Sequence, residues 1–153
     1  MTQVLIAHTA QLTPRELSSV LTLLDEAFDG EFSDQDYDHT LGGMHALLWD
    51  GSTLIGHGAV IMRRLLHREP SNPGGRSLRT GYVEGVAVCA DHRGHGHGHT
   101  VMAALKEIIG TGYQIGAEQL RIRNGLLSLP RLDGLVRHGV GHDSGRAHAL
   151  PSR

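Results

Sequence analysis

Two features of this chain could do chemistry, and they lie close together in the sequence. The first is Glu84, the single carboxylate in an otherwise apolar run from Val83 to Val88. The second is a glycine-rich run from Arg93 to Gly98, Arg-Gly-His-Gly-His-Gly. Glycine-rich backbone can approach an anion closely. The run therefore suggests a site for a bound phosphate group, and the lone carboxylate lies just before it in the sequence.

The elements that must hold these residues can be predicted from the surrounding pattern. The run from Val83 to Val88 is typical of a buried strand, and Cys89 to His92 suggests a short turn after it. Beyond the glycines, apolar residues from Val101 to Ile109 recur at helical spacing. A strand therefore leads through the glycine-rich loop into a helix N-terminus. Free N–H groups and the positive end of the helix dipole meet there, so we expect a phosphate or pyrophosphate ligand.

Several interpretations of the glycine-rich loop compete. It is not a P-loop, because no Gly-Lys-Ser/Thr follows the glycines. A dinucleotide-binding fold needs Gly-x-Gly-x-x-Gly after the first strand of a βαβ unit, whereas here the spacing is Arg-x-x-Gly-x-Gly and lies late in the chain. A tight glycine turn before an ordinary helix is the structural alternative, since short motifs have false positives. The carboxylate in the preceding apolar run weighs against that alternative.

Composition limits the class of protein. The 153 residues, 39% of them apolar and 20% charged, are enough for one soluble domain with a sizeable core. No run is long enough to span a membrane, and there is no basic-then-apolar leader, so we expect a cytoplasmic protein. A single cysteine, Cys89, excludes an internal disulfide, and we expect it to be a bystander. The net charge of −2 gives no reason to expect a nucleic acid partner.

The N-terminal half predicts one helix and a hairpin. Thr13-Pro14-Arg15-Glu16 has the pattern of a capping box with proline at the first helical position, and apolar residues then recur at helical spacing as far as Phe28. Strands are expected at 4–6, 40–49, 53–66 and from Tyr113 onward, with a turn at Asp50-Gly51. The stretch 68–77, rich in proline and glycine, is expected to be a flexible loop.

An acid-dense segment runs from Asp25 to Asp38, with Phe28, Phe32 and Tyr37 interleaved among its seven carboxylates. On composition alone a solvated helix end and loop is the favoured interpretation. The functional alternative is a patch that attracts a polycation, because clustered carboxylates near a cleft raise the local concentration of positive ligands.

With these residues in view, the chain resembles the aminoglycoside 2'-N-acetyltransferases, a branch of the GNAT superfamily, over about the first 117 residues. The glycine-rich loop resembles the acetyl-CoA loop of the superfamily as a whole. The specific matches are Gly30-Glu31-Phe32, the run Asp36-Tyr37-Asp38-His39-Thr40-Leu41-Gly42-Gly43-Met44-His45, the strand Gly81 to Val88, and Tyr113-Gln114-Ile115-Gly116. The resemblance implies an α/β fold of the α+β type, with a GNAT-like mixed central sheet, flanking helices and an incomplete C-terminal part.

The resemblance also implies a role for each matching residue. Glu84 would be the catalytic carboxylate that takes the proton from the attacking amine, directly or through water. The implied contacts with an aminoglycoside, a polycationic amine, are Glu31, Asp36, Glu84 and the backbone of Gly85. With the resemblance in view, we therefore interpret the acidic segment as a patch that binds a polyamine, and no longer as a solvated loop. Glu31 is one methylene longer than the family's aspartate. The implied acetyl-CoA contacts, including a strand amide that could polarise the thioester carbonyl, are Val86, Ala87, Val88, Arg93, Gly94, His95, Gly96, His97 and Gly98.

Histidines invite a different interpretation of the same loop. An alternating run of His95, His97 and His99 could bind zinc or nickel. We favour no metal, because side chains at a helix start should diverge and no cysteine or acid completes a site. His39 and His45 are expected to be structural.

The resemblance stops after Gly116. Residues 118–153 contain no aromatic side chain, although the family would place there a tyrosine that protonates the leaving thiolate, together with further drug contacts. We therefore divide the chain into a GNAT core, 1–117, and an atypical tail, 118–153, which we expect to be poorly ordered or translated out of frame. A codon sequence that forbids the neighbouring frame would refute this. If the tail cannot supply the family's next strand and helix, one wall of the cofactor cleft is missing. We therefore expect weak or no acetyl transfer.

The sequence thus leaves three functional hypotheses open. The leading one is an acetyl-CoA-dependent aminoglycoside 2'-N-acetyltransferase, for which a homodimer is also conceivable. The second is a GNAT enzyme for another amine, such as a peptide N-terminus or an amino sugar. The third is a non-catalytic acyl-CoA-binding protein, which would bind coenzyme A without releasing its thiol in the presence of any amine.

Overall fold

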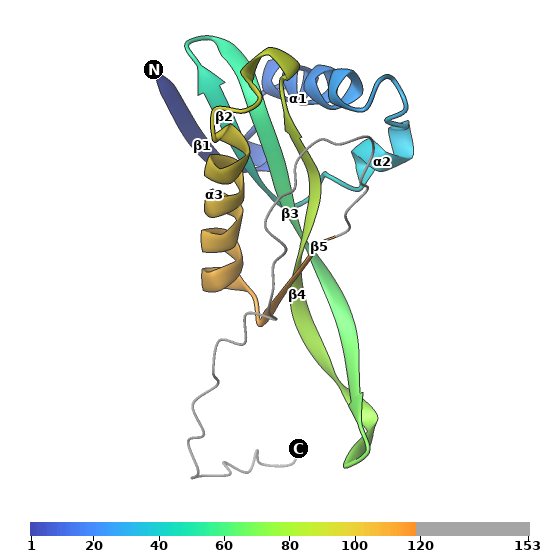
Figure 1. The fold of residues 1–153 in the computed structure, drawn as a ribbon. Coiled ribbons are helices and arrows are strands. Elements are labelled where there is room, and N and C mark those ends of the chain that lie inside the picture. The colour runs from blue at the N-terminus through green and yellow to red at the C-terminus, as the bar shows by residue number, and fades with distance from the viewer. Residues whose placement is uncertain (119–153) are drawn as a thin grey trace.

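The structure, a computed structural model, describes residues 1–118 of the chain (Figure 1). In chain order the elements are β1 (Thr2–His8), a 3-10 turn (Thr9–Gln11), α1 (Pro14–Ala27), α2 (Asp34–Asp38), β2 (Met44–Asp50), β3 (Thr53–Glu69), β4 (Asn72–Val88), a second 3-10 turn (Ala90–His92), α3 (His97–Gly112) and β5 (Ile115–Glu118). The predicted order of strand, helix, hairpin, strand, glycine-rich loop, helix and strand is present, and the short helix α2 is an addition to it.

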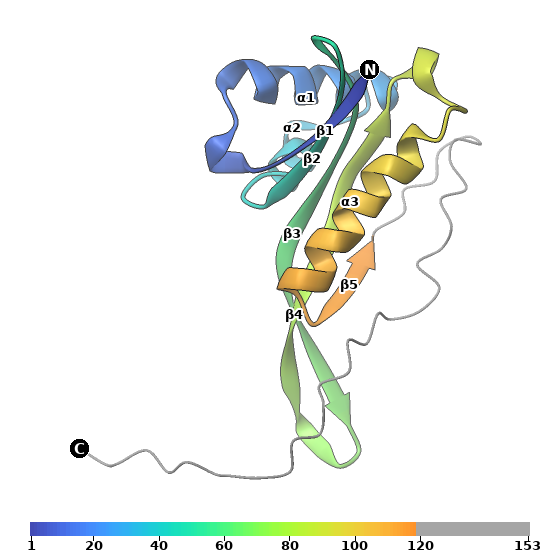
Figure 2. The ribbon, with the colours of Figure 1, turned by 90° about the vertical axis from the view of Figure 1, so that its left-hand side faces the viewer.

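The five strands form one mixed sheet in the order β1-β2-β3-β4-β5. The first four are antiparallel neighbours. Short turns join β2 to β3 and β3 to β4, whereas α1 and α2 lie between β1 and β2. β5 is parallel to β4, and α3 provides the crossover that a parallel pair requires. Helices α1 and α2 cover one face of the sheet and α3 covers the other (Figure 2). The predicted mixed sheet with flanking helices is confirmed.

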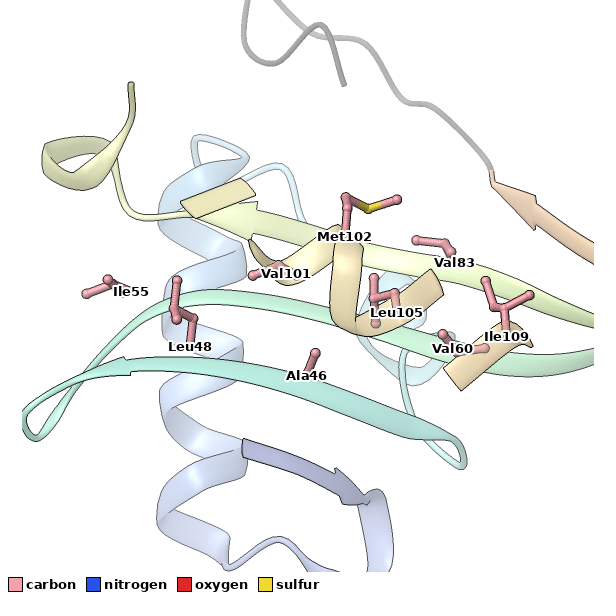
Figure 3. Packing of buried hydrophobic residues seen from close by; sticks show 9 residues of the cluster. All are labelled: Ala46, Leu48, Ile55, Val60, Val83, Val101, Met102, Leu105 and Ile109. Atoms are coloured by element: carbon pink, nitrogen blue, oxygen red, sulfur yellow. The ribbon is translucent and has the colours of Figure 1, made fainter. Parts of the chain in front are cut away.

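Each face of the sheet has its own apolar cluster. Because side chains alternate along a strand, the neighbours Leu47 and Leu48 of β2 point into different clusters, and both are fully buried. The cluster under α3 contains Ala46, Leu48, Ile55, Val60, Val83, Val101, Met102, Leu105 and Ile109 (Figure 3). The cluster under α1 contains Ala7, Leu12, Val20, Leu23, Leu24, Leu47, Leu54 and Ala87.

The start of α1 confirms the predicted capping box. The Thr13 hydroxyl accepts from the Glu16 amide at 3.3 Å, and the Glu16 carboxylate accepts from the Thr13 amide at 2.7 Å. These bonds satisfy two N–H groups that a helix start would otherwise leave without partners. The Thr13 amide, and the Thr13 hydroxyl that donates to the same carboxylate at 2.8 Å, lower the pKa of Glu16, because both bonds favour its ionised form.

The predicted loop at 68–77 is wrong. β3 and β4 continue as a long two-stranded arm that pairs as far as Glu69 with Asn72 and extends away from the rest of the molecule (Figures 1 and 2). Cross-strand pairs such as Leu65 with Leu78 outweigh the turn-forming composition. Pro73 is tolerated because it lies at the beginning of its strand.

The paired glycines before β2 have separate physical reasons. Gly42 has φ +83°, a left-handed conformation that favours glycine, whereas a Cβ on Gly43 would overlap the carbonyl oxygen of Val60. The Gly42 amide also donates to the Thr9 hydroxyl at 2.9 Å. These two residues let the chain enter β2 in close contact with β3.

Our prediction for the tail lies outside the described residues, apart from Glu118 at the end of β5. The strand expected from Tyr113 is present as β5. No helix within residues 1–118 is both long and apolar enough to cross a membrane.

Candidate active site

Glu84 lies near the C-terminal end of β4, on the face of the sheet that α1 covers. It is opposite Ala59 in the β3–β4 register, and its side chain is 16% exposed. The Arg63 guanidinium of β3 is 3.6 Å from a Glu84 carboxylate oxygen. The carboxylate is thus half-buried, retains access to solvent, and has one cation beside it.

A break in strand pairing follows immediately at Gly85. The register jumps from Ala59 opposite Glu84 to His57 opposite Ala87, so that Gly85 and Val86 have no place in the ladder. Gly85 has φ +57°, the left-handed conformation that glycine adopts in one kind of β-bulge. Such a bulge bends the strand and re-aims neighbouring side chains. Gly85, for which the resemblance implies a substrate contact, therefore lies in a β-bulge with a left-handed backbone conformation.

The α1–α2 region packs directly against this bulge. A Cβ on Gly85 would lie 2.7 Å from the Thr40 methyl group and 3.6 Å from a Leu24 methyl group. Thr40 is buried and its hydroxyl donates to the Tyr37 carbonyl of α2 at 2.7 Å. A residue two positions after the acidic segment therefore packs against the strand that bears Glu84.

The aromatic residues of the acidic segment act as its anchors. Phe28 and Phe32 stack with ring centroids 5.2 Å apart, and the Tyr37 hydroxyl donates to the Leu17 carbonyl of α1. All three rings pack on the cluster under α1, while Glu31 is exposed and Asp36 half-buried. Aromatic and acidic residues therefore alternate in the sequence because the rings attach the segment to the core while the carboxylates between them remain accessible to solvent.

Asp36 has a structural task that sequence reasoning missed. Its carboxylate accepts from the Ser33 amide at 3.2 Å and from the Ser33 hydroxyl at 2.8 Å, which completes a capping box on α2. The signal was present as Ser33-x-x-Asp36, a pattern that we left within the acidic segment. Asp36 therefore orders the segment to which it belongs.

The glycine-rich loop leads into α3 as predicted. Gly94 and Gly96 have φ of +80° and +82°, and a Cβ on either would meet nothing within 4 Å. These glycines are therefore required by backbone conformation rather than by space. Gly96 caps α3 without any side-chain bond, and the first turn of α3 contains no acidic residue. The amides of His97 and Gly98 begin the helix, so the loop can accept an anion.

Arg93 does not point freely from this loop. Its Nε donates to the Val88 carbonyl at 3.1 Å and so ties the loop to the end of β4. Val88 and Ala87 are buried, and Val86 packs against the cluster under α3. Among the described residues β5 pairs with β4 only along Thr80–Val83. The stretch from Glu84 to Val88 therefore has no described strand partner on the β5 side.

The histidines of the loop are near one another without converging. The ring centroids of His95 and His97 are 6.1 Å apart, and those of His92 and His97 are 6.2 Å apart. Within residues 1–118 no group of three or more histidine, cysteine or acidic side chains could hold a metal ion.

Sequence reasoning also missed His57, which lies behind the bulge. Its Nδ1 is 2.7 Å from the Gly85 carbonyl oxygen, and its Nε2 is 2.9 Å from His45 Nδ1. His45 Nε2 is in turn 2.7 Å from the Thr9 hydroxyl. Both rings are fully buried, and burial lowers the pKa of His45 to about 4 and that of His57 to about 3. Two histidines on adjacent predicted strands were the available signal.

Comparison with known proteins decides the family. Residues 13–115 match the family model described as the acetyltransferase (GNAT) family. The chain belongs to the acetyltransferase (GNAT) family. Our prediction of this family is confirmed.

Among curated proteins, this GNAT chain is similar to the aminoglycoside 2'-N-acetyltransferase of Mycolicibacterium fortuitum. The two are 43% identical over 112 residues, which cover 73% of this chain and 54% of that protein. The chain thus spans about half the length of the curated relative that it matches. The predicted resemblance to this branch of the GNAT family is confirmed.

Solved structures support the GNAT fold. Escherichia coli ElaA has a TM-score of 0.56 at 21% identity and covers 73% of this chain, with 72% of its own chain matched. An aminoglycoside acetyltransferase from an uncultured soil metagenomic sample has a TM-score of 0.58 at 15% identity, with 100% of this chain and 99% of its own covered. At these identities the likeness concerns the fold.

Proposed function

We propose that this protein transfers the acetyl group of acetyl-CoA to the 2'-amine of an aminoglycoside. The single observation that carries the proposal is the half-buried Glu84 immediately before the positive-φ bulge at Gly85, on the strand that leads into the glycine-rich helix start. A base and an anion-accepting loop then lie at the same end of β4. We assign both functions to residues 1–117.

In the proposed mechanism the loop binds the pyrophosphate of acetyl-CoA. The amides at the start of α3 and the helix dipole stabilise the two negative charges of the pyrophosphate. Gly94 and Gly96 hold the loop backbone in a left-handed conformation that other residues adopt only at a cost in free energy. The acyl arm would then run along Val86–Val88, beside Glu84. No metal is required for this binding.

The chemical step needs an uncharged amine. Glu84 takes one proton from the substrate ammonium, directly or through one water molecule, and the amine nitrogen attacks the thioester carbon. A C–N bond forms and the C–S bond breaks as the oxyanion collapses. The second proton leaves nitrogen and ends on the sulfur of coenzyme A. A backbone N–H of the bulge can stabilise the oxyanion.

The substrate class follows from the acidic segment. α2 bears Asp34, Asp36 and Asp38, and Thr40, two residues after its end, packs against Gly85. A polycation gains from such a patch, whereas a neutral acceptor does not. The name of the Mycolicibacterium fortuitum relative agrees with a polyamine sugar as the acceptor.

The proposal is tested by acetyl transfer with aminoglycosides that have or lack a free 2'-amine. We expect thiol release and a single added acetyl group, seen by mass spectrometry, only where that amine is present. Transfer to peptide N-termini instead would overturn the substrate assignment. Binding of coenzyme A without thiol release for any amine would overturn the enzyme assignment.

Neutralising the acidic segment should weaken binding of the aminoglycoside. We expect the pair Glu31→Gln and Asp36→Asn to raise KM by about ten-fold at low salt, with less effect at high salt, because exposed charges are screened. Asparagine can still accept from Ser33, so the α2 cap should survive. Steady-state kinetics at two ionic strengths measures the effect.

The matched control removes the same charge elsewhere. Glu69 at the tip of the β3–β4 arm and Glu107 on α3 lie outside the acidic segment. Glu69→Gln with Glu107→Gln should leave KM unchanged. Equal rises in KM for both pairs would show that only net charge matters.

A further inference from the structure

The hydrogen bonds behind the bulge form a chain whose direction can be deduced. The Gly85 carbonyl can only accept, so His57 Nδ1 must carry its proton. Because burial keeps the His57 ring neutral, its Nε2 accepts from His45 Nδ1. The same reasoning makes His45 Nε2 an acceptor for the Thr9 hydroxyl. Every donor therefore points toward Gly85.

This chain is not suited to carrying protons. Its last member is a peptide carbonyl, which cannot pass a proton on, and no protonated ring is stable at neutral pH in this buried site. Its other physical effect is polarisation, because successive hydrogen bonds in one direction strengthen one another in a low dielectric. The Gly85 carbonyl oxygen thus receives a bond that two further donors reinforce.

The peptide that ends the chain lies in the bulge itself. Gly85 and Val86 fall outside the β3–β4 register, and the peptide bond that joins them is trans. In a trans peptide the N–H points opposite to the C=O. The Val86 N–H therefore points away from His57, and a hydrogen bond at the carbonyl makes it a stronger donor.

We propose that His57 is a positioning residue for acetyl transfer: the Thr9–His45–His57 chain fixes and polarises the Gly85–Val86 peptide, whose N–H donates to the thioester oxygen. This inference rests on the proposed function, because it assigns the source of the N–H that stabilises the oxyanion. His57 touches neither substrate. It acts through the backbone next to Glu84, and a buried donor at this place also prevents the bulge from relaxing into a regular ladder.

A pair of amide substitutions separates the two hydrogen bonds of His57. In His57→Asn the amide nitrogen can occupy the place of Nδ1 and still donate to Gly85, but the bond to His45 is lost. In His57→Gln the amide lies near the place of Nε2, and the bond to Gly85 is lost. We expect His57→Gln to lower kcat per folded molecule by about ten-fold, with the KM for acetyl-CoA unchanged, and His57→Asn to retain most of kcat.

The folded fraction and thermal stability are measured for both variants, since a merely structural role would lower activity only in proportion to folding. Equal kcat per folded molecule in the two variants would overturn the proposal. His67→Gln, at the end of the arm, is the matched control and should change nothing.

A spectroscopic measurement decides the inference independently of turnover. The Val86 amide proton should shift upfield in His57→Gln and stay close to its wild-type position in His57→Asn. If the wild type acetylates no amine, the proposed function fails, while this shift still tests whether the chain polarises the peptide. Identical Val86 shifts in both variants would overturn it.

A milder variant guards against unfolding of the buried substitutions. Thr9→Val removes the first donor from outside the buried pair, and Thr9→Ser restores it. We expect a smaller upfield shift of Val86 in Thr9→Val and recovery in Thr9→Ser. An unchanged Val86 amide shift in Thr9→Val would show that the Thr9 hydroxyl does not contribute to polarising the Gly85–Val86 peptide, which would contradict that part of the proposal.

Discussion

Replacing Glu84 with glutamine is expected to lower kcat for acetyl transfer by about 100- to 1000-fold, because a positioned base contributes a factor of this order. Glutamine has nearly the same shape but cannot take the ammonium proton. The affinity for coenzyme A should stay within about two-fold, since the loop that we propose binds it begins beyond the end of β4. Thiol-release kinetics measures kcat, and calorimetry measures the affinity for coenzyme A.

The residual rate of Glu84→Gln should rise with pH, because free amine then forms without help from the protein. Glu107→Gln on α3 removes the same charge from a surface outside the site and should retain full activity. A Glu84→Gln protein with wild-type kcat at neutral pH would rule out Glu84 as the base.

Acidification from pH 7 to pH 5 is expected to lower the free energy of unfolding by about 4 kcal/mol, through His45 and His57 together. Both pKa values lie well below the ordinary 6.5 in the folded protein, because burial disfavours the charged rings. The unfolded chain therefore binds more protons as the pH falls through 6.5. The stabilisation is fully present above that pH and is lost below it.

Urea unfolding followed at several pH values between 7.5 and 5 measures this loss. The exposed control His99→Gln should leave the pH dependence unchanged. The variant with His45→Gln and His57→Gln should be less stable at pH 7 but should vary less with pH. A wild-type protein whose unfolding free energy is constant across this range would contradict the predicted burial of the two neutral rings.

Local signals account for the parts of the site that sequence reasoning predicted well. The Thr13–Glu16 box and the spacing after it are contained within one helix, and the structure has both. The Gly94 and Gly96 conformations likewise depend on neighbours in the chain, so the loop before α3 could be inferred. Short-range chemistry is enough for such features.

The failures have two causes: pairing between distant segments, and a local signal hidden within an acidic run. The stretch 68–77 has turn composition but joins a two-stranded arm, because the register of β3 with β4 decides it. Ser33 and Asp36 were noticed only as part of an acidic run, although their spacing is that of a helix start. Composition concealed the local order there.

By itself the sequence determined that a lone carboxylate precedes an anion-accepting helix start, and that acids cluster earlier in the chain. Only the tertiary structure decided what stands behind the carboxylate. His57 is 28 positions from Gly85 and 12 from His45, and nothing in the pattern of either strand specifies a contact between them. The physical reason is that a β-bulge and the register around it are set by pairing across the sheet, where one skipped residue changes which side chains meet.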